Sequence, residues 1–345
     1  MNGDRVTALP RIDLIADGPP VGYLQTAAAF LAEEDPPLAF IVPELLPHGV
    51  LVLVHGEPRA RKSLAALELT VAAATGTAAF GLPRFTPPEP VPVMYVQEED
   101  PRPLTRPRLR ALIAARGRCP ETLHVAVRQG VDLDDPVWVS QLIGDLKRLG
   151  AKLLVLDAAR RLSAKTDEGP TKVRELTRVL RLIVTQAGVS VLVVHHDVKP
   201  PSNGQDQRRR TQRASGGDWF AACECPLFVE KLSAHESLVF PEDFKFGTDP
   251  APFTFTCQIQ DKLIVKLIGI DTTIEHAETA GATGKLYAWL RTNGPATKTA
   301  IKKAGFGWEA VERHLTVLEK AGKVDSGPGR KAGTTAYFVV PEPSS

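Results

Sequence analysis

The sequence has little cysteine, little net charge and no long hydrophobic run. Its 345 residues include 4 cysteines, and 42 Lys and Arg nearly balance 40 Asp and Glu. Four scattered cysteines exclude a disulfide-stapled scaffold, and the Cys223–Cys225 pair lacks a second pair at zinc spacing, which favours buried thiols. No stretch approaches about 18 uninterrupted apolar residues, so no membrane-spanning helix is expected. The first residues do not follow the pattern of a secretory signal, which predicts a cytoplasmic protein.

The composition is that of a globular protein, but its charge is unevenly placed. The length of 345 residues exceeds one ordinary domain of about 100–200 residues and predicts two or three domains. Residues 281–345 hold 10 Lys and Arg against 5 Asp and Glu, which leaves 32 cations and 35 anions in residues 1–280. The near-neutral total argues against a nucleic-acid-binding protein. The location of the charge reverses that inference, because the basic C-terminal residues could bind the phosphates of a nucleic acid.

Short apolar runs alternate with helical segments from about residue 49. Runs of this kind are typical of strands that are buried on both faces, and their alternation with helices predicts a mostly parallel sheet. The predicted strands cover 50–54, 93–96, 123–127, 152–156 and 189–194. The clearest helices cover 63–75 and 171–187. Three later segments, 227–231, 237–240 and 254–270, look like antiparallel strands that close this domain.

We therefore predict three parts: a lead-in over 1–45, an α/β domain over 46–275 and a small C-terminal domain over 284–340. The lead-in contains a predicted helix over 24–34. The C-terminal part has predicted helices over 285–291, 297–304 and 308–321, then a basic turn and a strand. This order is typical of a winged helix-turn-helix. Such domains bind DNA or other proteins, and the basic charge favours DNA. The candidate phosphate contacts here are Lys302, Lys303, Arg313, Arg330 and Lys331.

The strongest site signal is a loop that joins the first predicted strand to a helix. Its order of strand, loop, Lys-Ser and helix is that of a phosphate-binding loop. Backbone N–H groups and the helix N-terminus would face the phosphates of ATP, and Lys62 would reach the β- and γ-phosphates. The candidate nucleotide-binding residues are Gly56, Glu57, Pro58, Arg59, Ala60, Arg61, Lys62, Ser63 and Leu64.

This loop departs from the usual pattern at one position, where Arg61 replaces the second glycine. Glycine permits a positive φ, whereas arginine costs roughly 1 kcal/mol in a left-handed conformation. Arginine also adds a positive charge that suits a triphosphate. The loop is therefore either a working ATP site with an unusual residue or a weakened site that binds ATP without turnover. A chance strand–turn–helix is the remaining alternative.

Polar residues follow three of the predicted strands. In an open parallel sheet, ligands bind at the carboxyl ends of the strands. The strand over 93–96 is followed by Gln97, Glu98, Glu99 and Asp100, the strand over 152–156 by Asp157, and the strand over 189–194 by His195, His196 and Asp197. Hydroxyl and carboxylate oxygens are the ligands that Mg²⁺ prefers. The sequence thus predicts a magnesium site at Ser63 and Asp157.

These segments together resemble RecA-type ATPases in their order and spacing. More closely, the chain resembles the RepA-like hexameric helicase group over about residues 45–235, through the segments 56–63, 98–101, 157–161, 195–199 and 213–216. The resemblance implies a RecA-like P-loop NTPase core, ATP and Mg²⁺ as ligands, and a homo-hexameric ring. It further implies single-stranded DNA as partner and a role in replication of a plasmid, phage or mobile element.

The resemblance also implies roles for single residues. Glu99 would orient and activate water, with Glu98 as the alternative if the register differs by one. His196 would sense the γ-phosphate, with His195 as the alternative. Arg213 would act as an arginine finger that reaches into the site of the next subunit.

A basic run in a predicted exposed loop offers a DNA contact. Arg208, Arg209 and Arg210 would either be a solvated loop or contact DNA phosphates at the pore of a ring. The predicted function is an ATP-hydrolysing, DNA-associated motor of the RepA-like helicase type. The alternatives are an ATP-switched DNA-binding regulator or initiator with little turnover because of Arg61, and an interaction protein with a vestigial site.

Overall fold

The computed structural model describes residues 24–33, 38–167, 169–197, 218–242, 244–247, 249–260, 263–271, 281–306, 308–320, 324–328 and 334–340. The chain separates into two units, residues 1–39 and 40–345. In the first unit, helix α1 (Ala27–Ala32) is shorter than predicted and begins where the Thr26 hydroxyl accepts the Ala29 N–H at 3.1 Å. The predicted boundaries near residues 45, 275 and 284 stay predictions.

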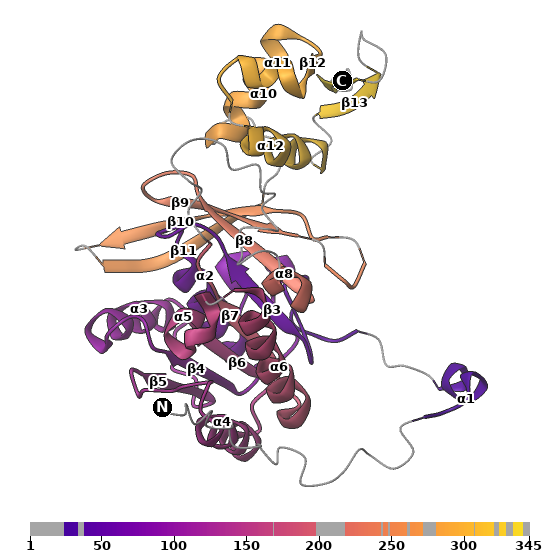
Figure 1. Ribbon diagram of the computed structural model, residues 1–345. Helices are drawn as coiled ribbons and strands as arrows, with labels where there is room; N and C mark the ends of the chain where they lie inside the picture. Colours follow the sequence, from indigo (N-terminus) through magenta and orange to yellow (C-terminus); the bar gives the residue numbers. More distant parts are fainter. Residues whose placement is uncertain are drawn as a thin grey trace, which may run out of the picture. The chain divides into compact units, whose positions relative to one another are not determined.

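Within the described residues of the second unit, nine strands form one sheet (Figure 1). Neighbouring strands from β8 to β5 pair in parallel, whereas those from β8 to β11 pair antiparallel. The predicted α/β class with a mostly parallel sheet is therefore confirmed. In spatial order the strands are β11 (Leu263–Asp271), β10 (Phe253–Gln260), β9 (Glu236–Pro241), β8 (Cys225–Lys231), β3 (Leu51–His55), β7 (Ser190–Val194), β6 (Leu153–Asp157), β4 (Val93–Gln97) and β5 (Leu123–Val127).

The antiparallel extension differs from the prediction in two ways. Strand β8 is antiparallel only to β9, because its other edge pairs in parallel with β3, where Leu227 lies opposite Val54. The single strand predicted over 254–270 is two strands that pair with each other. The sequence could not predict either feature. The alternation of side chains along a strand shows which face of the sheet a residue occupies, but not which strand lies next to it.

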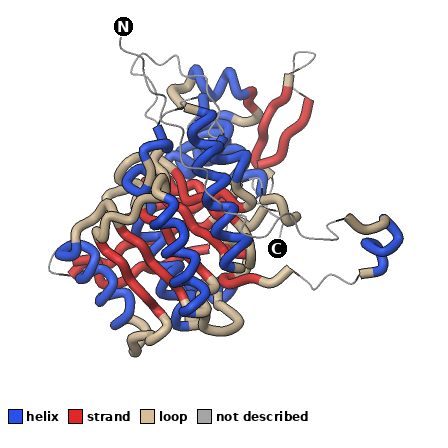
Figure 2. The backbone as a smooth tube through the Cα atoms, turned by 60° about the horizontal axis from the view of Figure 1, so that its bottom comes forward, coloured by secondary structure: helices blue, strands red, loops and turns tan. Residues whose placement is uncertain are grey.

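Helices cover both faces of the parallel part of the sheet (Figure 2). Alternate strand residues point to opposite faces, so Val52 and Val54 pack on one side, and Leu51 and Leu53 on the other. All residues of β3, β4, β6 and β7 are buried, as predicted for strands between two helical layers. One layer contains α2 (Lys62–Thr75) and α3 (Arg102–Ala114); the other contains α4 (Pro136–Leu149), α5 (Ala159–Leu162), α6 (Pro170–Ala187) and α8 (Asp218–Ala222).

Helix α2 positions the candidate site, since it begins directly after the loop that follows β3. Almost all of its residues are buried between the sheet and its neighbours, and Gly76 ends it in a left-handed conformation at φ 67°. The remaining elements of this unit before the C-terminal part are β1 (Phe40–Val42), β2 (Leu46–Pro47) and the 3₁₀ helices Ala79–Gly81, Pro83–Phe85 and Ala164–Asp167. None of the helices in the described residues is both long and apolar enough to cross a membrane.

The described residues between 281 and 340 form a small helical core with a three-stranded antiparallel sheet. The sheet order is β12-β14-β13. Leu286, Leu315 and Leu318 are buried in a hydrophobic cluster with Ile301 and Tyr337. The elements are α10 (Gly281–Asn293), β12 (Ala296–Thr297), α11 (Lys298–Lys303), α12 (Trp308–Lys320), β13 (Val324–Pro328) and β14 (Thr335–Val339).

Candidate functional site

The loop between β3 and α2 begins at a glycine that no other residue can replace without a shift. Gly56 has φ 144°, and a Cβ built on it would lie 2.2 Å from the carbonyl oxygen of Val229 on β8. The close approach of β8 therefore requires glycine at this position. Arg59 and Arg61 are also left-handed, at φ 67° and 71°. The backbone of Arg61 thus has the conformation for which glycine is usually present.

The Arg61 side chain is bound by the hairpin between β8 and β9. Its Nη1 donates to the carbonyl oxygen of Glu236 at 2.9 Å and to the Ser237 hydroxyl at 2.8 Å. Its Nη2 donates to the carbonyl oxygens of Ser233, at 3.2 Å, and Ala234. The structure does not support the expectation that the charge of Arg61 binds a triphosphate, because the guanidinium group donates to backbone carbonyl oxygens of the hairpin.

The conformation of Arg61 gives a testable prediction about stability. Arg61→Gly and Arg61→Ala both lose the bonds to the hairpin, but only alanine has a Cβ that opposes the left-handed conformation. We expect the Ala variant to be less stable than the Gly variant by about 1 kcal/mol. Urea unfolding of the two full-length variants measures this difference. Equal stability would contradict a left-handed residue 61.

Lys62 is buried, and its ammonium group folds back onto the loop. Its Nζ donates to the carbonyl oxygens of Gly56, at 2.8 Å, and Glu57, at 2.7 Å. Burial lowers the pKa of Lys62 to about 8, although the negative charges of Asp197, Glu99 and other carboxylates oppose this effect. The ammonium group therefore donates to neutral carbonyl oxygens, and a phosphate oxygen could replace these contacts.

Ser63 and Asp157 lie together, although they are far apart in the sequence. The Ser63 hydroxyl donates to Asp157 Oδ1 at 3.0 Å. The other carboxylate oxygen, Oδ2, accepts the Tyr95 hydroxyl and the Gln97 side-chain amide, each at 2.9 Å. Burial raises the pKa of Asp157 to about 6, and the hydrogen bonds from Tyr95 and Ser63 counteract part of that rise. These oxygen donors fit Mg²⁺, which prefers hard oxygen ligands.

The two adjacent glutamates after β4 have different partners. Glu99 Oε2 lies 3.1 Å from His196 Nε2, and this hydrogen bond holds the pKa of Glu99 below its usual range. Glu98 instead accepts backbone N–H groups from Gln129 at 2.9 Å and Val131 at 3.3 Å. Glu98 therefore caps the loop after β5, while Glu99 faces the residues around Lys62.

The two adjacent histidines also differ in surroundings. His195 is buried and stacks on Trp219, with ring centroids 5.1 Å apart. Burial lowers its pKa to about 3, so the ring is neutral at physiological pH. His196 is half-buried and contacts Glu99. Of the two, His196 is the one that contacts Glu99, and its γ-phosphate sensor role stays a prediction.

Sequence reasoning missed a buried ionic cluster beside the loop. His55, the last residue of β3, lies 3.1 Å from Asp197 and 3.6 Å from Glu242. Burial alone would lower the pKa of His55, but the charges of Asp197 and Glu242 outweigh it and raise the pKa to about 9. The charged ring thus joins the ends of β3, β7 and β9. Its signal in the sequence is weak, because one polar residue at the end of an apolar strand is common.

Several predicted contacts cannot be placed. Arg208, Arg209, Arg210 and Arg213 lie outside the described residues, as do Arg330 and Lys331. Lys302 and Lys303 are exposed in the last turn of α11, and Arg313 belongs to α12. The nucleic-acid contacts and the arginine finger therefore stay predictions.

Comparisons with known proteins locate the similarity in the part of the chain that carries this site. Residues 19–202 match the family described as AAA domain. One similar solved structure is that of the RadB recombinase, with 18% identity, a TM-score of 0.42 and coverage of 61% of this chain and 88% of that chain. A second, described as an ATPase domain, has 13% identity, a TM-score of 0.46 and coverage of 64% of this chain and 84% of that chain. No curated protein matches the chain. The family match includes the loop from Gly56 to Ser63, the end of β4, Asp157 and both histidines.

Proposed function

The chain belongs to the AAA domain family, and from this premise we propose that it is a Mg²⁺-dependent ATPase that acts as a DNA-associated motor in the cytoplasm. The observation that carries the proposal is the convergence of Lys62, Ser63, Glu99 and Asp157 at the carboxyl ends of β3, β4 and β6. In an open parallel sheet this is where ligands bind. The four side chains provide the cation, the metal ligands and the base that phosphoryl transfer to water requires.

Each residue has a defined task in the proposed reaction. The loop N–H groups and Lys62 bind the phosphates of ATP. Ser63 and Asp157 would hold Mg²⁺, and the ion would supply positive charge to the phosphate oxygens. Glu99 accepts a proton from the attacking water while His196 holds its carboxylate in place. Tyr95 and Gln97 fix the Asp157 carboxylate, so that Oδ1 remains directed at Ser63.

The proposal extends to the assembly through residues that resemble RepA-like helicases. Arg213 would complete the site of a neighbouring subunit, which requires a ring or filament, and we propose a homo-hexamer. Arg208, Arg209 and Arg210 would contact single-stranded DNA in its pore. The motif resemblance supports these points, along with a role in replication of a plasmid, phage or mobile element.

We further propose that residues 284–340 are a winged helix-turn-helix that contacts DNA. The order of α10, β12, α11, α12, β13 and β14 supports this, because it places a hairpin after a three-helix core. The exposed Lys302 and Lys303 would face phosphate, together with Arg313, Arg330 and Lys331.

Steady-state ATP hydrolysis by the full chain, with and without single-stranded DNA, tests the proposal. We expect turnover on the order of 1 s⁻¹ or more that DNA stimulates. Tight ATP binding without turnover would contradict the motor and support the ATP-switched regulator. A particle mass that remains monomeric with ATP and DNA would contradict the ring and the role of Arg213.

A further inference from the structure

The segment that follows the candidate catalytic glutamate is strongly basic. Residues 101–120 contain six arginines and neither lysine, aspartate nor glutamate, whereas residues 1–280 as a whole carry a small excess of acid. Most of this segment is helix α3, which begins two residues after Asp100. Sequence reasoning missed it, because the arginines are spaced through a helix and do not form a run. They are Arg102, Arg106, Arg108, Arg110, Arg116 and Arg118.

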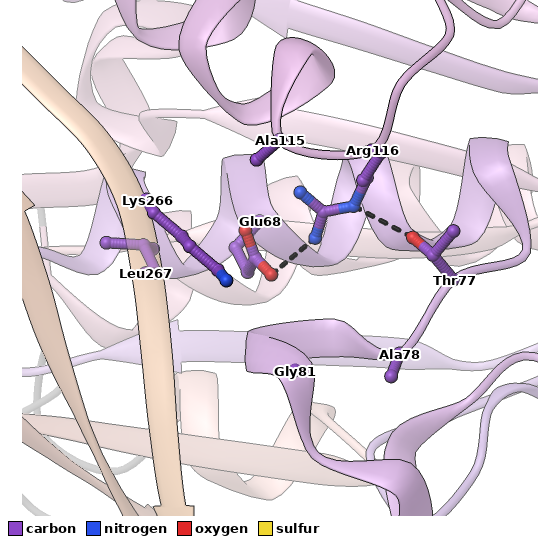
Figure 3. Close-up of a pocket in the computed structure, with 8 residues that line it drawn as sticks. All are labelled: Glu68, Thr77, Ala78, Gly81, Ala115, Arg116, Lys266 and Leu267. Atoms are coloured by element: carbon purple, nitrogen blue, oxygen red, sulfur yellow. Dashed lines mark hydrogen bonds and ion pairs between the residues drawn. The ribbon is translucent and has the colours of Figure 1, made fainter.

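Two of these arginines fix α3 to the elements around the nucleotide site. Arg108 pairs with Asp100, the neighbour of Glu99. Arg116, just after the end of α3, pairs with the buried Glu68 of α2 beside a cavity of about 390 Å³ (Figure 3). Its Nε also donates to the Thr77 hydroxyl at 2.8 Å. These two side chains therefore have structural partners at both ends of the helix.

Three other arginines have no such partner. Arg102, Arg106 and Arg110 are exposed, and within the described residues none of them forms a hydrogen bond or an ion pair. Arg102 is the first residue of α3, where the helix dipole disfavours positive charge. Stability of the helix does not account for cations at this end.

The three side chains form one surface along the helix. Their spacing of four residues places them within an arc of about 80° and about 6 Å apart along the axis. Arg102 and Arg106 also line a groove of about 300 Å³ between α3 and β5. Leu109, Val125 and Val127 provide its apolar wall. The groove thus places a row of guanidinium groups beside an apolar surface.

We propose that this surface of α3 and β5 binds single-stranded nucleic acid, with phosphates on Arg102, Arg106 and Arg110 and bases against the apolar wall. Guanidinium groups bind phosphate through two parallel hydrogen bonds and stack on bases, which explains the use of arginine alone. A row of charges beside an apolar wall suits a polymer that carries phosphates along one side and bases along the other. The inference rests on the proposed DNA-associated function and adds a contact outside the arginines of residues 208–210.

The salt dependence of binding tests this surface. The probe is a fluorescein-labelled oligothymidylate, and the triple variant is Arg102→Ala, Arg106→Ala and Arg110→Ala in the full chain. We expect its affinity to fall by about tenfold or more, and the slope of log K against log salt to become shallower by about 2, since each phosphate contact on a single strand contributes about 0.7. The matched control is Lys147→Ala, Lys152→Ala and Arg178→Ala, which removes exposed cations from α4, from the residue before β6 and from α6. It should change neither the folded state nor the slope by a comparable amount.

The outcomes separate this surface from the proposed function. Binding of a fluorescent ATP analogue shows that each variant is folded. An unchanged slope in the α3 variant, or an equal change in the control, would overturn the proposal for α3 while the ATPase proposal stands. Loss of self-association without a change in DNA binding would assign the surface to contacts between copies of the chain and would also overturn it. Absence of DNA binding by the unaltered chain would contradict both.

Discussion

Glu99→Gln is expected to lower kcat for ATP hydrolysis by about 10²- to 10⁴-fold and to leave ATP binding nearly unchanged. The amide that replaces the carboxylate can hold a water molecule but cannot accept its proton. Glu99 follows β4 and is not part of the loop that we propose to bind the phosphates, and its side chain contacts His196 at 3.1 Å. Single-turnover hydrolysis and equilibrium binding of an ATP analogue measure the two effects separately.

The neighbouring glutamate provides the matched control. Glu98→Gln changes the same chemical group one residue away, but Glu98 accepts N–H groups of the loop after β5. We expect this variant to lose some stability and to retain most of kcat. A larger loss of kcat in Glu98→Gln than in Glu99→Gln would show that the catalytic register differs by one residue.

Lys62→Ala is expected to reduce kcat/KM by about 10²-fold or more, because it removes the buried cation that faces the phosphates. The burial that lowers the pKa of Lys62 to about 8 also strengthens the interaction of its charge with an anion. Removal of the side chain also takes away the positive charge that would contact the phosphates, so ATP should bind less tightly. Steady-state kinetics over a range of ATP concentrations measures both effects.

Lys152→Ala is the corresponding control for a loss of positive charge. Lys152 is exposed and directly precedes β6, so it lies at the opposite end of that strand from Asp157. Its removal should leave kcat/KM within about twofold of the unaltered chain, because exposed charges at this distance are screened by salt. An equal loss in the two variants would contradict the placement of the phosphates at Lys62.

The parallel core could be predicted from the sequence because its strands are buried on both faces. Short apolar runs such as 50–54 and 189–194 are typical of buried strands. The structure has strands whose bounds lie within one residue of these runs. The extension beyond β8 was harder to predict, because the partners of its strands depend on long-range pairing. The parallel pairing of β8 with β3 has no signal in local sequence.

The candidate site was likewise predictable only in part from the sequence. The residues at motif positions were predictable, because residue type and spacing indicated that they would meet at the carboxyl ends of the strands. These residues are Lys62, Ser63 and Asp157. Their supporting residues did not stand out: Tyr95 and Gln97 occupy alternate positions of an apolar strand, and only the fold reveals that both contact Asp157. The direction of the Arg61 side chain likewise depends on the hairpin from Ser233 to Ser237, more than 170 residues away.

Calorimetric titration of the full chain with a non-hydrolysable ATP analogue most directly tests the central claim that the loop after β3 and Asp157 form a Mg²⁺–ATP site. The account predicts binding of a single nucleotide per chain, weakened when Mg²⁺ is chelated and when Asp157 is changed to Asn. It also predicts that Lys62→Ala loses most of the affinity, whereas Lys152→Ala retains it. No binding by the unaltered chain, or equal binding by the Lys62→Ala chain, would contradict it.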